Sequence, residues 1–552
     1  MAETETAVEG IKRDSHHLRG NLANDLASPA AAVDGDSEQL LKFHGIYAQD
    51  NRDVRRARAQ AKEELDYIFM IRVVIPGGRL RAAQWLALDA VADDLADGSI
   101  RLTTRQAVQF HGVVKHGLRP LAQSLDQYLL SSFGGCGDVV RNVVMCPHLQ
   151  LEQDGHELAA IATSLAVRFR PRTQAHWEIF VNGERAASRE SDDEHPFYGD
   201  TYLPRKFKIA VAHPDENCVD VFAQDVGLIP ATHPSLGVGF NVIVGGGLGR
   251  SYANPETFAR LGDLLAFVPT NDVDAVIAAV VATYKDLGDR TDRKRARMKY
   301  LVADNGLDAF RAEVEARFGS PLASPLGLPA TFEGRDHLGW EQAADGSWSV
   351  GVRVEAGRFR DRGAMRLRSA LRALATALPV SFLLTPEQNI IITNVTSEER
   401  AFVDAHLRDH GVTPAEELGR VAREALACVA LPTCSQALTE AERALPDVVR
   451  TLEASLESHG PAVTPLQVRV TGCPNGCARP AVAEVGIVGR TKTSYDVYLG
   501  GGRAGDRLAR LAHEKVALSD LAGTLEPYFA RWRDEGADGE SFGDFITRVG
   551  LS

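Results

Sequence analysis

The feature that most constrains the fold of this chain is an internal sequence repeat, in which two distant stretches carry the same elements in the same order. The first copy reads "IPGGRLRAAQW" at 75–85 and "IRLTTRQAVQFHGV" at 100–113; the second reads "VEAGRFRDRGA" at 354–364 and "FLLTPEQNIIITNV" at 382–395. Each has Gly-Arg, a helical stretch, and Leu-Thr-x-x-Gln leading into a strand. This order predicts a two-fold pseudo-repeat with a site where the halves meet.

The repeat continues further along each half with a cysteine segment, a basic strand and a triple glycine. In order, these are "RNVVMCP" (141–147) and "ACVALPTC" (427–434), "PRKFKIAV" (204–211) and "LQVRVTGCP" (466–474), and "IVGGGLGR" (243–250) and "YLGGGRAG" (498–505). Neither triple glycine has the G-x-G-x-x-G spacing of a dinucleotide site. Because no flavin or NADPH motif is found, we expect electrons to come from a partner protein.

Hydrophobic periodicity indicates a mixed fold of helices and strands. Residues 82–98 predict an amphipathic helix, 100–114 a strand pair, and 273–284 a buried helix. Residues 435–457 predict a long amphipathic helix that is kinked around Pro446. The pattern favours α+β layers.

Length and composition limit the functional classes. A chain of 552 residues should form three or so domains, and its formal net charge of −13 argues against general nucleic-acid binding. No apolar run reaches the roughly 18 residues that a membrane span needs. The opening "MAETETAVEG" lacks the features of a secretory signal, and the odd count of seven cysteines favours a reducing compartment, the cytoplasm.

Two polar N-terminal stretches have their own interpretation. Residues 1–38 are rich in Ala, Asp, Glu and Ser and are predicted to form a loosely ordered leader. The charged "DNRDVRRARAQAKEEL" (50–65) is expected to be a solvated helix or an arm that lies over another domain.

Four of the cysteines have the spacing C-x5-C-x38-C-x3-C, formed by Cys428, Cys434, Cys473 and Cys477. Thiolates from two loops can bind a metal. Zinc more often uses two C-x2-C knuckles, and spacings of five and three also fit a four-iron cluster, so both sites and plain packing stay open. Cys136, Cys146 and Cys218 are scattered and are predicted to be buried and inert.

The segments "CVALPTCSQALTEAERALPD" and "VRVTGCPNGCARPAVAEVGIVGR" closely resemble the assimilatory sulfite reductase hemoproteins of the sirohaem sulfite and nitrite reductase family. The resemblance runs from about residue 40 to the C-terminus and includes "KFHGIYAQDNRD", "TYLPRKFKIAV" and "GFNVIVGGGLGR". It implies that the four cysteines hold a [4Fe–4S] cluster. It also implies that Cys477 is the axial ligand of the sirohaem iron, so that one thiolate serves two cofactors.

The resemblance further implies a three-domain α+β fold with an internal duplication of ferredoxin-reductase-like units. The expected parts are an N-terminal extension (1–66), a discontinuous ferredoxin-like repeat domain (67–134 and 338–415), a first sirohaem-binding α/β domain (135–337) and a second α/β domain with the cysteines (416–552).

A site for sulfite and the polycarboxylate sirohaem must be cationic. The resemblance assigns sulfite binding and catalysis to Arg72, Arg141, Lys206 and Lys208, and sirohaem binding to Arg101, Arg105, Gln109, His111, Arg205, Arg297, Asn475 and Cys477. Lys206 and Lys208 are two apart, which independently suits one face of a strand. In the second copy Leu383, Glu387 and Ile391 replace Arg101, Arg105 and Gln109, which predicts a single active site.

The implied activity is the six-electron reduction of sulfite to sulfide in cysteine biosynthesis. The nearest alternative is reduction of nitrite to ammonia, because the family's chemistry overlaps. A non-catalytic iron–sulfur electron carrier and a zinc-stapled binding module are alternatives from other classes. The donor is an NADPH flavoprotein, as "KFHGIYAQDNRDVRRARAQ" suggests, or a ferredoxin, as "GGCGDVVRNVV" and "GRDHLGWEQ" suggest.

Overall fold

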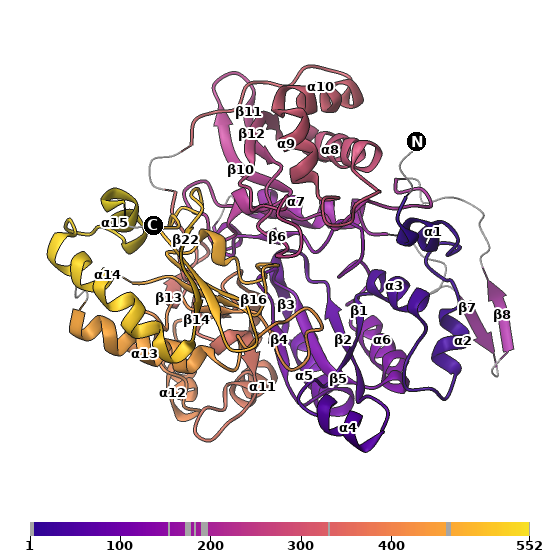
Figure 1. Ribbon diagram of the computed structural model, residues 1–552, viewed down its shortest axis with the longest axis horizontal. Helices are drawn as coiled ribbons and strands as arrows, with labels where there is room; N and C mark the ends of the chain where they lie inside the picture. The colour runs from indigo at the N-terminus through magenta and orange to yellow at the C-terminus, as the bar shows by residue number, and fades with distance from the viewer. Residues whose placement is uncertain are drawn as a thin grey trace.

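The computed structural model describes residues 5–152, 155–171, 178–181, 184–188, 197–328, 332–459 and 465–550. Its described strands form four five-stranded sheets and the separate pair β7 (Glu178–Val181) and β8 (Glu184–Ser188). Figure 1 shows the N-terminal sheet at the right, the C-terminal sheet at the left and a third layer at the top. The segments that carry the predicted site converge between these layers.

Two antiparallel sheets contain the two copies of the first repeat, and each includes a short strand from the other copy. The first has the order β1-β2-β5-β4-β15 and the second β13-β14-β17-β16-β3. Their strands are β1 (Ile46–Asp50), β2 (Tyr67–Val73), β3 (Arg79–Arg81), β4 (Ile100–Leu102), β5 (Val108–Val113), β13 (Gly339–Gln342), β14 (Trp348–Val352), β15 (Arg358–Phe359), β16 (Ser381–Leu384) and β17 (Ile390–Val395). The reciprocal exchange of β3 and β15 confirms the predicted duplication.

The Leu-Thr-x-x-Gln segments meet at the pseudo-two-fold axis. Gln106 donates from Nε2 to the carbonyl of Leu384 at 2.7 Å, and Gln388 donates from Nε2 to the carbonyl of Leu102 at 3.2 Å. Both glutamines are buried and have positive φ angles of 49° and 62°. Each copy thus fixes the strand end of the other.

The other two sheets also repeat one topology. Their orders are β12-β11-β10-β9-β6 and β18-β19-β20-β21-β22. The strands are β6 (Val144–Met145), β9 (Ile209–Val211), β10 (Val226–His233), β11 (Gly237–Val244), β12 (Asp263–Pro269), β18 (Leu426–Ala427), β19 (Val468–Thr471), β20 (Val485–Gly489), β21 (Tyr495–Leu499) and β22 (Arg510–Val516). In each sheet the first three strands in chain order are parallel and the last two are antiparallel.

Helices cover the outer faces of the sheets (Figure 1). They are α5 (Ala82–Leu95), α6 (Leu118–Gln127), α7 (Gly155–Arg168), α8 (Val273–Leu287), α9 (Met298–Asn305), α10 (Leu307–Phe318), α11 (Leu367–Ala377), α12 (Arg400–Asp409), α13 (Leu445–His459), α14 (Leu521–Glu535) and α15 (Phe542–Val549). The predicted helices 82–98 and 273–284 and the strand pair 100–114 are confirmed. The helix predicted at 435–457 was wrong at its start, because Pro446 lies in the first turn of α13 rather than at a kink. None of the described helices is long and apolar enough to cross a bilayer.

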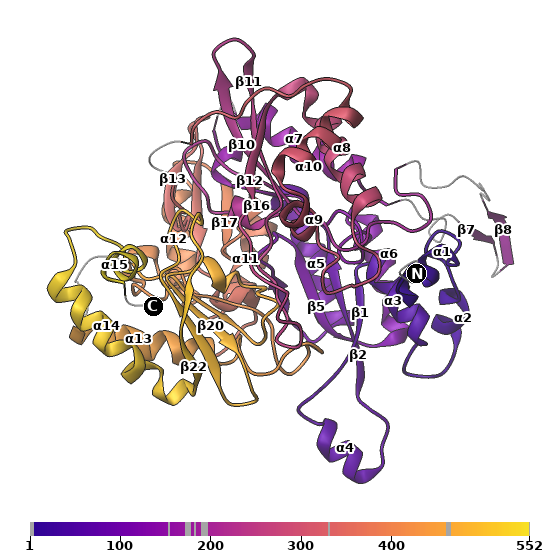
Figure 2. The same ribbon diagram turned by 45° about the horizontal axis from the view of Figure 1, so that its top comes forward.

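The prediction of a loosely ordered leader was wrong. Residues 5–43 contain α1 (Ala7–Arg13), α2 (Leu22–Ala27) and α3 (Gly35–Phe43), which pack on the body. The physical reason is burial: apolar side chains such as Leu18 and Leu40 join the main hydrophobic core. Glu9 and Lys12 are buried too, where they are joined at 2.6 Å and Lys12 also lies 3.8 Å from Asp138. The helix α4 (Arg55–Ala61) has no buried residue and projects from the molecule (Figure 2).

Candidate functional site

The four spaced cysteines meet at one edge of the C-terminal sheet. Cys428 directly follows β18, and Cys473 follows β19 after one residue, in the turn that leads to Cys477. Because β18 and β19 are adjacent and parallel, their carboxyl ends open at the same edge. The backbone N–H of Gly472 donates to Cys428 Sγ at 3.3 Å, which joins the two cysteine segments directly.

The thiols influence one another electrostatically. Burial raises the pKa of Cys428, of Cys434 and, to about 12, of Cys473, and the neighbouring Cys477 thiol raises all three further. Four such thiols cannot all ionise beside one another without a cation among them. An iron cluster supplies that positive charge.

The spacing of the sulfur atoms separates a cluster from a single zinc ion. A tetrahedral zinc site with Zn–S bonds of about 2.3 Å places its sulfurs about 3.8 Å apart. Among the described residues, two groups have three or more ligand atoms within 4.8 Å of one another, and neither contains Cys428, Cys434, Cys473 or Cys477. No three of these sulfurs therefore lie as close together as a single zinc ion requires, which favours the larger iron–sulfur cluster.

Cys477 differs from the other three because it is exposed. Its sulfur interacts electrostatically with Arg72, after Cys136 and Tyr47, and with Lys206, and in both cases it opposes the lowering of the pKa by burial. Cys477 therefore lies near the cations as well as near the other thiols. The hydroxyl of Thr104 donates to the Cys477 carbonyl at 3.0 Å and fixes this turn against the first repeat.

The cations beside Cys477 form what we call the cation cluster, in which each side chain perturbs the pKa of others. Its members are Arg72, Arg105, Arg141, Arg205, Lys206, Lys208 and Arg297. Burial, followed by the positive charge of Arg141, lowers the pKa of Arg105 to about 9. So many like charges at one place indicate an anion-binding site.

Lys206 and Lys208 flank Phe207, which is fully buried, so both side chains leave the extended chain on the same side. Among the described residues, neither ammonium has a hydrogen bond or an ion pair with a side chain. Burial lowers the pKa of Lys206 to about 7, and burial together with Lys206 lowers that of Lys208 well below its usual value. Both lysines are half-buried, and within the described part of the chain neither ammonium forms an ion pair, so together they offer a binding site for an anion.

The arginines of the cluster are more firmly held. Arg72 donates to Cys136 Sγ at 3.2 Å. When the side-chain amide of Gln109 is oriented so that its oxygen faces Arg72, this oxygen accepts from Arg72 Nη2 at 2.7 Å. Arg141 donates to the Gly137 carbonyl at 2.9 Å and to the Gly135 carbonyl at 3.2 Å. These bonds orient two guanidinium groups without neutralising them.

Three other predicted residues have definite partners. Arg297 forms an ion pair with the buried Asp225 at 2.8 Å through Nη2, and Arg205 lies 3.6 Å from Asp138. Arg105 donates to Gln224 at 2.9 Å, while its Nε is buried without a partner. Within the described parts of the chain, these are the two carboxylates that form ion pairs with the cluster, so an additional polycarboxylate group such as sirohaem fits its donor set.

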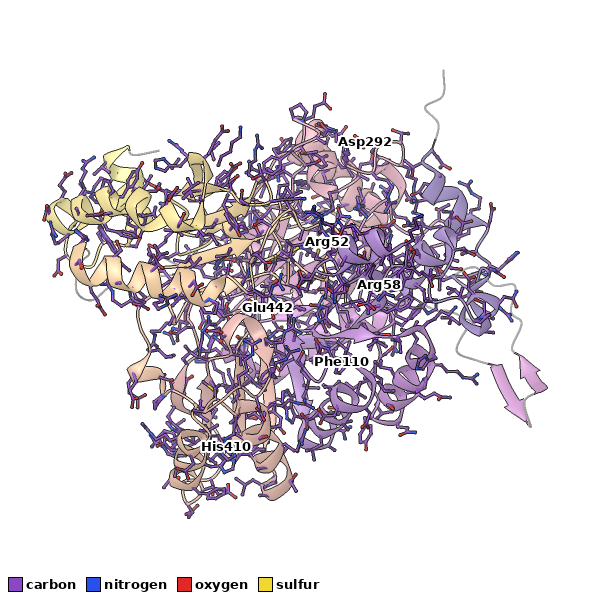
Figure 3. The ribbon with its side chains drawn as sticks, turned by 60° about the horizontal axis from the view of Figure 1, so that its bottom comes forward. Arg52, Arg58, Phe110, Asp292, His410 and Glu442 are labelled. Atoms are coloured by element: carbon purple, nitrogen blue, oxygen red, sulfur yellow. The ribbon has the colours of Figure 1, made fainter. Side chains whose placement is uncertain are left out.

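Arg101 and His111 lie in a separate group on the Cys428 side. Glu442 accepts from Arg101 Nε at 2.8 Å and from Arg358 Nε at 2.6 Å, and Arg101 also donates to the Ala427 carbonyl at 2.8 Å. Burial and the nearby Arg358 lower the pKa of His111 well below its usual value, and its buried Nε2 has no partner. This ion-pair group holds the Cys428 segment against the first repeat, near the middle of the molecule (Figure 3).

Sequence reasoning missed several supporting residues. Arg52 donates to the carbonyls of Cys434 at 3.0 Å and Ala437 at 2.6 Å, which confirms the expectation that residues 50–65 include an arm over another domain. The N–H of Arg250, at the end of the first triple-glycine segment, donates to the Pro474 carbonyl at 3.0 Å. Asn475 supports the same turn, since its side chain hydrogen-bonds to Cys473.

Comparisons with known proteins agree with this geometry. Residues 160–322 match the family model described as the nitrite and sulphite reductase 4Fe-4S domain, and residues 60–128 match the nitrite/sulfite reductase ferredoxin-like half domain. Relatives named sulfite reductase [NADPH] hemoprotein beta-component include one from Methylobacterium sp. (strain 4-46), 45% identical over 99% of this chain and 90% of its own. Another, from Xanthomonas campestris pv. campestris (strain B100), is 43% identical over 99% of this chain and 96% of its own.

The fold is also similar to a solved structure. The Mycobacterium tuberculosis NirA protein aligns with a TM-score of 0.81 at 25% sequence identity, over 99% of this chain and 97% of that chain. The similarity therefore extends over both copies of the repeat.

Proposed function

The chain belongs to the nitrite and sulfite reductase family, and on that premise we propose that it reduces sulfite to sulfide. The observation that carries this proposal is that the Cys477 thiol interacts electrostatically both with the three other cysteines and with Arg72 and Lys206 of the cation cluster. A redox centre and an anion site therefore share one residue. In the reaction sulfite takes up six electrons and loses its three oxygens as water.

Cys428, Cys434, Cys473 and Cys477 would hold the [4Fe–4S] cluster, and Cys477 would also hold the sirohaem through its iron. When bound, these two groups supply the electrons and the iron to which the substrate is brought. The turn around Cys477 is preorganised for both by its contact with Thr104.

Arg72, Arg141, Lys206 and Lys208 would bind the oxygens of sulfite. The two arginines are held by backbone carbonyls or by Gln109 and Cys136, so they can offer fixed donors to an anion. The ammonium groups of the two lysines have no competing hydrogen-bond or ion-pair partner among the residues that the structure describes. Because the pKa of Lys206 is lowered to about 7, this ammonium can give up a proton at neutral pH as each oxygen leaves.

The sirohaem carboxylates would be bound by Arg105, Gln109, Arg205, Arg297 and Asn475. Arg101 and His111 would bind them on the side nearer the [4Fe–4S] cysteines. Arg297 keeps its Nη1 outside the ion pair with Asp225, and Arg105 keeps an unpartnered Nε. The orphan Nε2 of His111 is a further polar atom available to the cofactor. In the second copy, Glu387 occupies the position of Arg105 and burial raises its pKa to about 8, so no second cationic pocket forms there.

The electron donor is proposed to be an NADPH-dependent flavoprotein subunit, because the relatives at 43–45% identity are named beta-components of an NADPH enzyme. A ferredoxin is the alternative donor. We place the protein in the cytoplasm, because free cysteines persist in a reducing compartment and a donor of either kind can occur there.

The test is anaerobic turnover of the purified protein with reduced methyl viologen, with sulfide and ammonium measured as products. We expect stoichiometric sulfide from sulfite and a higher kcat/KM for sulfite than for nitrite. Preferential turnover of nitrite would make the chain a nitrite reductase of the same family, and no turnover of either anion by cofactor-loaded protein would reject the enzymatic function.

A further inference from the structure

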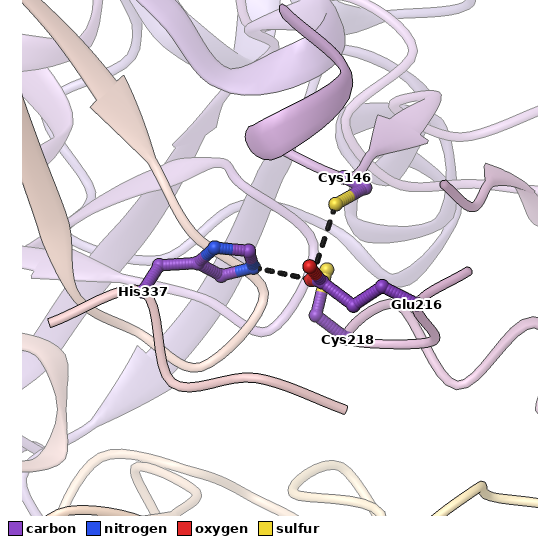
Figure 4. A group of neighbouring side chains, drawn as sticks. All are labelled: Cys146, Glu216, Cys218 and His337. Carbon is purple, nitrogen blue, oxygen red and sulfur yellow. Dashed lines mark hydrogen bonds and ion pairs between the residues drawn. The ribbon is translucent and has the colours of Figure 1, made fainter. Parts of the chain in front are cut away.

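A second group of metal-ligating side chains lies outside the redox site. Cys146, Glu216, Cys218 and His337 each offer one ligand atom, and these atoms all lie within 4.8 Å of one another. Figure 4 shows the two sulfurs, the carboxylate and the imidazole pointing toward a common centre. The sequence prediction that Cys146 and Cys218 are inert packing residues did not foresee this arrangement.

The group is almost closed to solvent. Cys146 is fully buried, Glu216 and Cys218 have relative exposures of 2% and 3%, and the His337 side chain has 4%. Two thiols, a carboxylate and an imidazole are costly to bury together unless something satisfies their charges and lone pairs. Cys146 and Cys218 also belong to the main hydrophobic core, so the carboxylate and the imidazole are the groups whose burial needs a partner.

The polar atoms of the group are only partly satisfied by one another. His337 Nε2 lies 2.7 Å from Glu216 Oε1 in an ion pair, and the Cys146 thiol donates to the same oxygen at 3.3 Å. Glu216 Oε2 is buried without a hydrogen bond of good geometry, although His148 Nδ1 lies 3.4 Å and Arg335 Nε 3.8 Å from it. Ligand atoms thus converge on one carboxylate whose second oxygen lacks a good hydrogen bond, an arrangement that a bound cation would complete.

The ligands come from three separate segments that the fold fixes around this point. Cys146 follows β6, Glu216 and Cys218 lie in the turn after β9, and His337 comes from the connection between the two halves. The backbone N–H of Asn217 donates to the Glu333 carbonyl at 3.0 Å, so the connection is docked on that turn before any metal binds. The site is therefore largely preformed.

Residues outside the ligand group also hold the turn that carries Glu216 and Cys218. His148 Nδ1 lies 3.4 Å from Glu216 Oε2, and stacks on His213 with ring centroids 4.8 Å apart. Arg479 donates from Nη1 to the Cys218 carbonyl at 3.2 Å. Carboxylate and thiolate ligands at metal sites are oriented by outer partners of this kind.

We propose that Cys146, Cys218, His337 and Glu216 bind one Zn²⁺ ion as a structural site that ties the connection between the halves to the first α/β sheet. Thiolate, imidazole and carboxylate are the ligands that tetrahedral zinc takes, and four protein ligands with no open position mark a structural rather than a catalytic ion. The site uses none of the four cluster cysteines. The proposal does not depend on the reduction of sulfite.

The test begins with metal analysis of untagged, cofactor-loaded protein from zinc-replete cells by inductively coupled plasma mass spectrometry. About one zinc per chain is expected, as for a closed four-ligand site. The variant C146A/C218A should lose the zinc. Two controls are matched to it: C136A removes another buried thiol and should keep the zinc, while C434A should lose iron and keep the zinc.

Zinc K-edge absorption of the wild-type protein keeps the proposal testable if C146A/C218A does not fold, because iron does not contribute at this edge. The nearest coordination sphere should contain two sulfurs at about 2.3 Å and two nitrogen or oxygen atoms at about 2.0–2.2 Å. Four sulfurs would place the zinc among the cluster cysteines and overturn the proposal, as would a sphere of light atoms alone. Zinc-free wild-type protein, or equal zinc in wild type and C146A/C218A, would also overturn it.

Discussion

Replacing Lys206 with methionine tests the anion site most sharply, because it removes one charge while keeping most of the side-chain volume. The ammonium of Lys206 has no partner among the described side chains, so the substitution breaks no hydrogen bond or ion pair that the structure shows. A hydrogen bond to a charged group contributes about 1.5–3 kcal/mol. At about 1.4 kcal/mol per factor of ten, kcat/KM for sulfite should fall about 10- to 150-fold.

The assay is anaerobic sulfide production with reduced methyl viologen, normalised to sirohaem content measured by absorption. The matched control is Lys115→Met. Lys115 is also partly buried, but its ammonium donates to the Asp25 carbonyl at 2.9 Å and to Ser28 at 3.1 Å, in the N-terminal segment. That variant should keep wild-type kcat/KM per sirohaem. If Lys206→Met loses sirohaem and turnover in equal proportion, Lys206 has a structural role and the reasoning is refuted.

Lys206 also determines whether sulfite binding takes up or releases a proton. In the sulfite-free protein, burial and then Arg297 lower the pKa of Lys206 from 10.5 to about 7, so the amine is largely neutral above that pH. Sulfite favours the charged ammonium, and its binding should therefore take up a proton between about pH 7 and 10.5. Calorimetry at pH 8 in buffers of different ionisation enthalpy should detect this uptake and a smaller one in Lys206→Met. Proton release on binding would contradict the account.

Three further changes have defined outcomes. Cys477→Ser should eliminate both cofactors or uncouple them, and an intact cluster–sirohaem pair in its absorption and electron paramagnetic resonance spectra would rule out the shared thiolate. Glu442→Gln leaves the buried Arg101 and the half-buried Arg358 without their counter-ion and should cost about 3–5 kcal/mol, measured as a lower urea midpoint for loss of the cluster absorption. Burial raises the pKa of Glu442, but Arg358 and Arg101 outweigh it and lower the pKa from 4.5 to about 2. The stability that this carboxylate contributes should therefore be present above pH 4.5 and vanish as the pH falls toward 2. Arg52→Ala removes two bonds to the Cys434 segment and should speed iron loss in air several-fold; an unchanged rate would show that the arm does not protect this segment.

The sequence predicted those parts of the fold that depend on local patterns. The paired Leu-Thr-x-x-Gln segments predicted the duplication, and the reciprocal bonds of Gln106 and Gln388 are its structural counterpart. Apolar periodicity predicted α5 and α8 because both bury one face against a sheet. The start of α13 was missed because a proline in the first turn of a helix and one at a kink give similar patterns.

What could not be predicted depends on contacts between distant segments. The order of residues 5–43 depends partly on buried ion pairs such as Glu9 with Arg290, and an acidic, polar composition gives no sign of them. Glu442 and Arg358 stand in segments that the sequence had singled out for other reasons, yet only the fold shows that they meet. The group around Cys146 and Cys218 likewise takes His337 from a connection that carries no motif.

The most direct test of the central claim is an anaerobic titration of the reduced, cofactor-loaded protein with sulfite, followed by absorption in the sirohaem bands. The account predicts that the bands shift on addition of sulfite and that six electrons from methyl viologen are consumed for each sulfide formed. A protein without sirohaem bands from cells that make sirohaem, or bands that do not respond to sulfite, would contradict it.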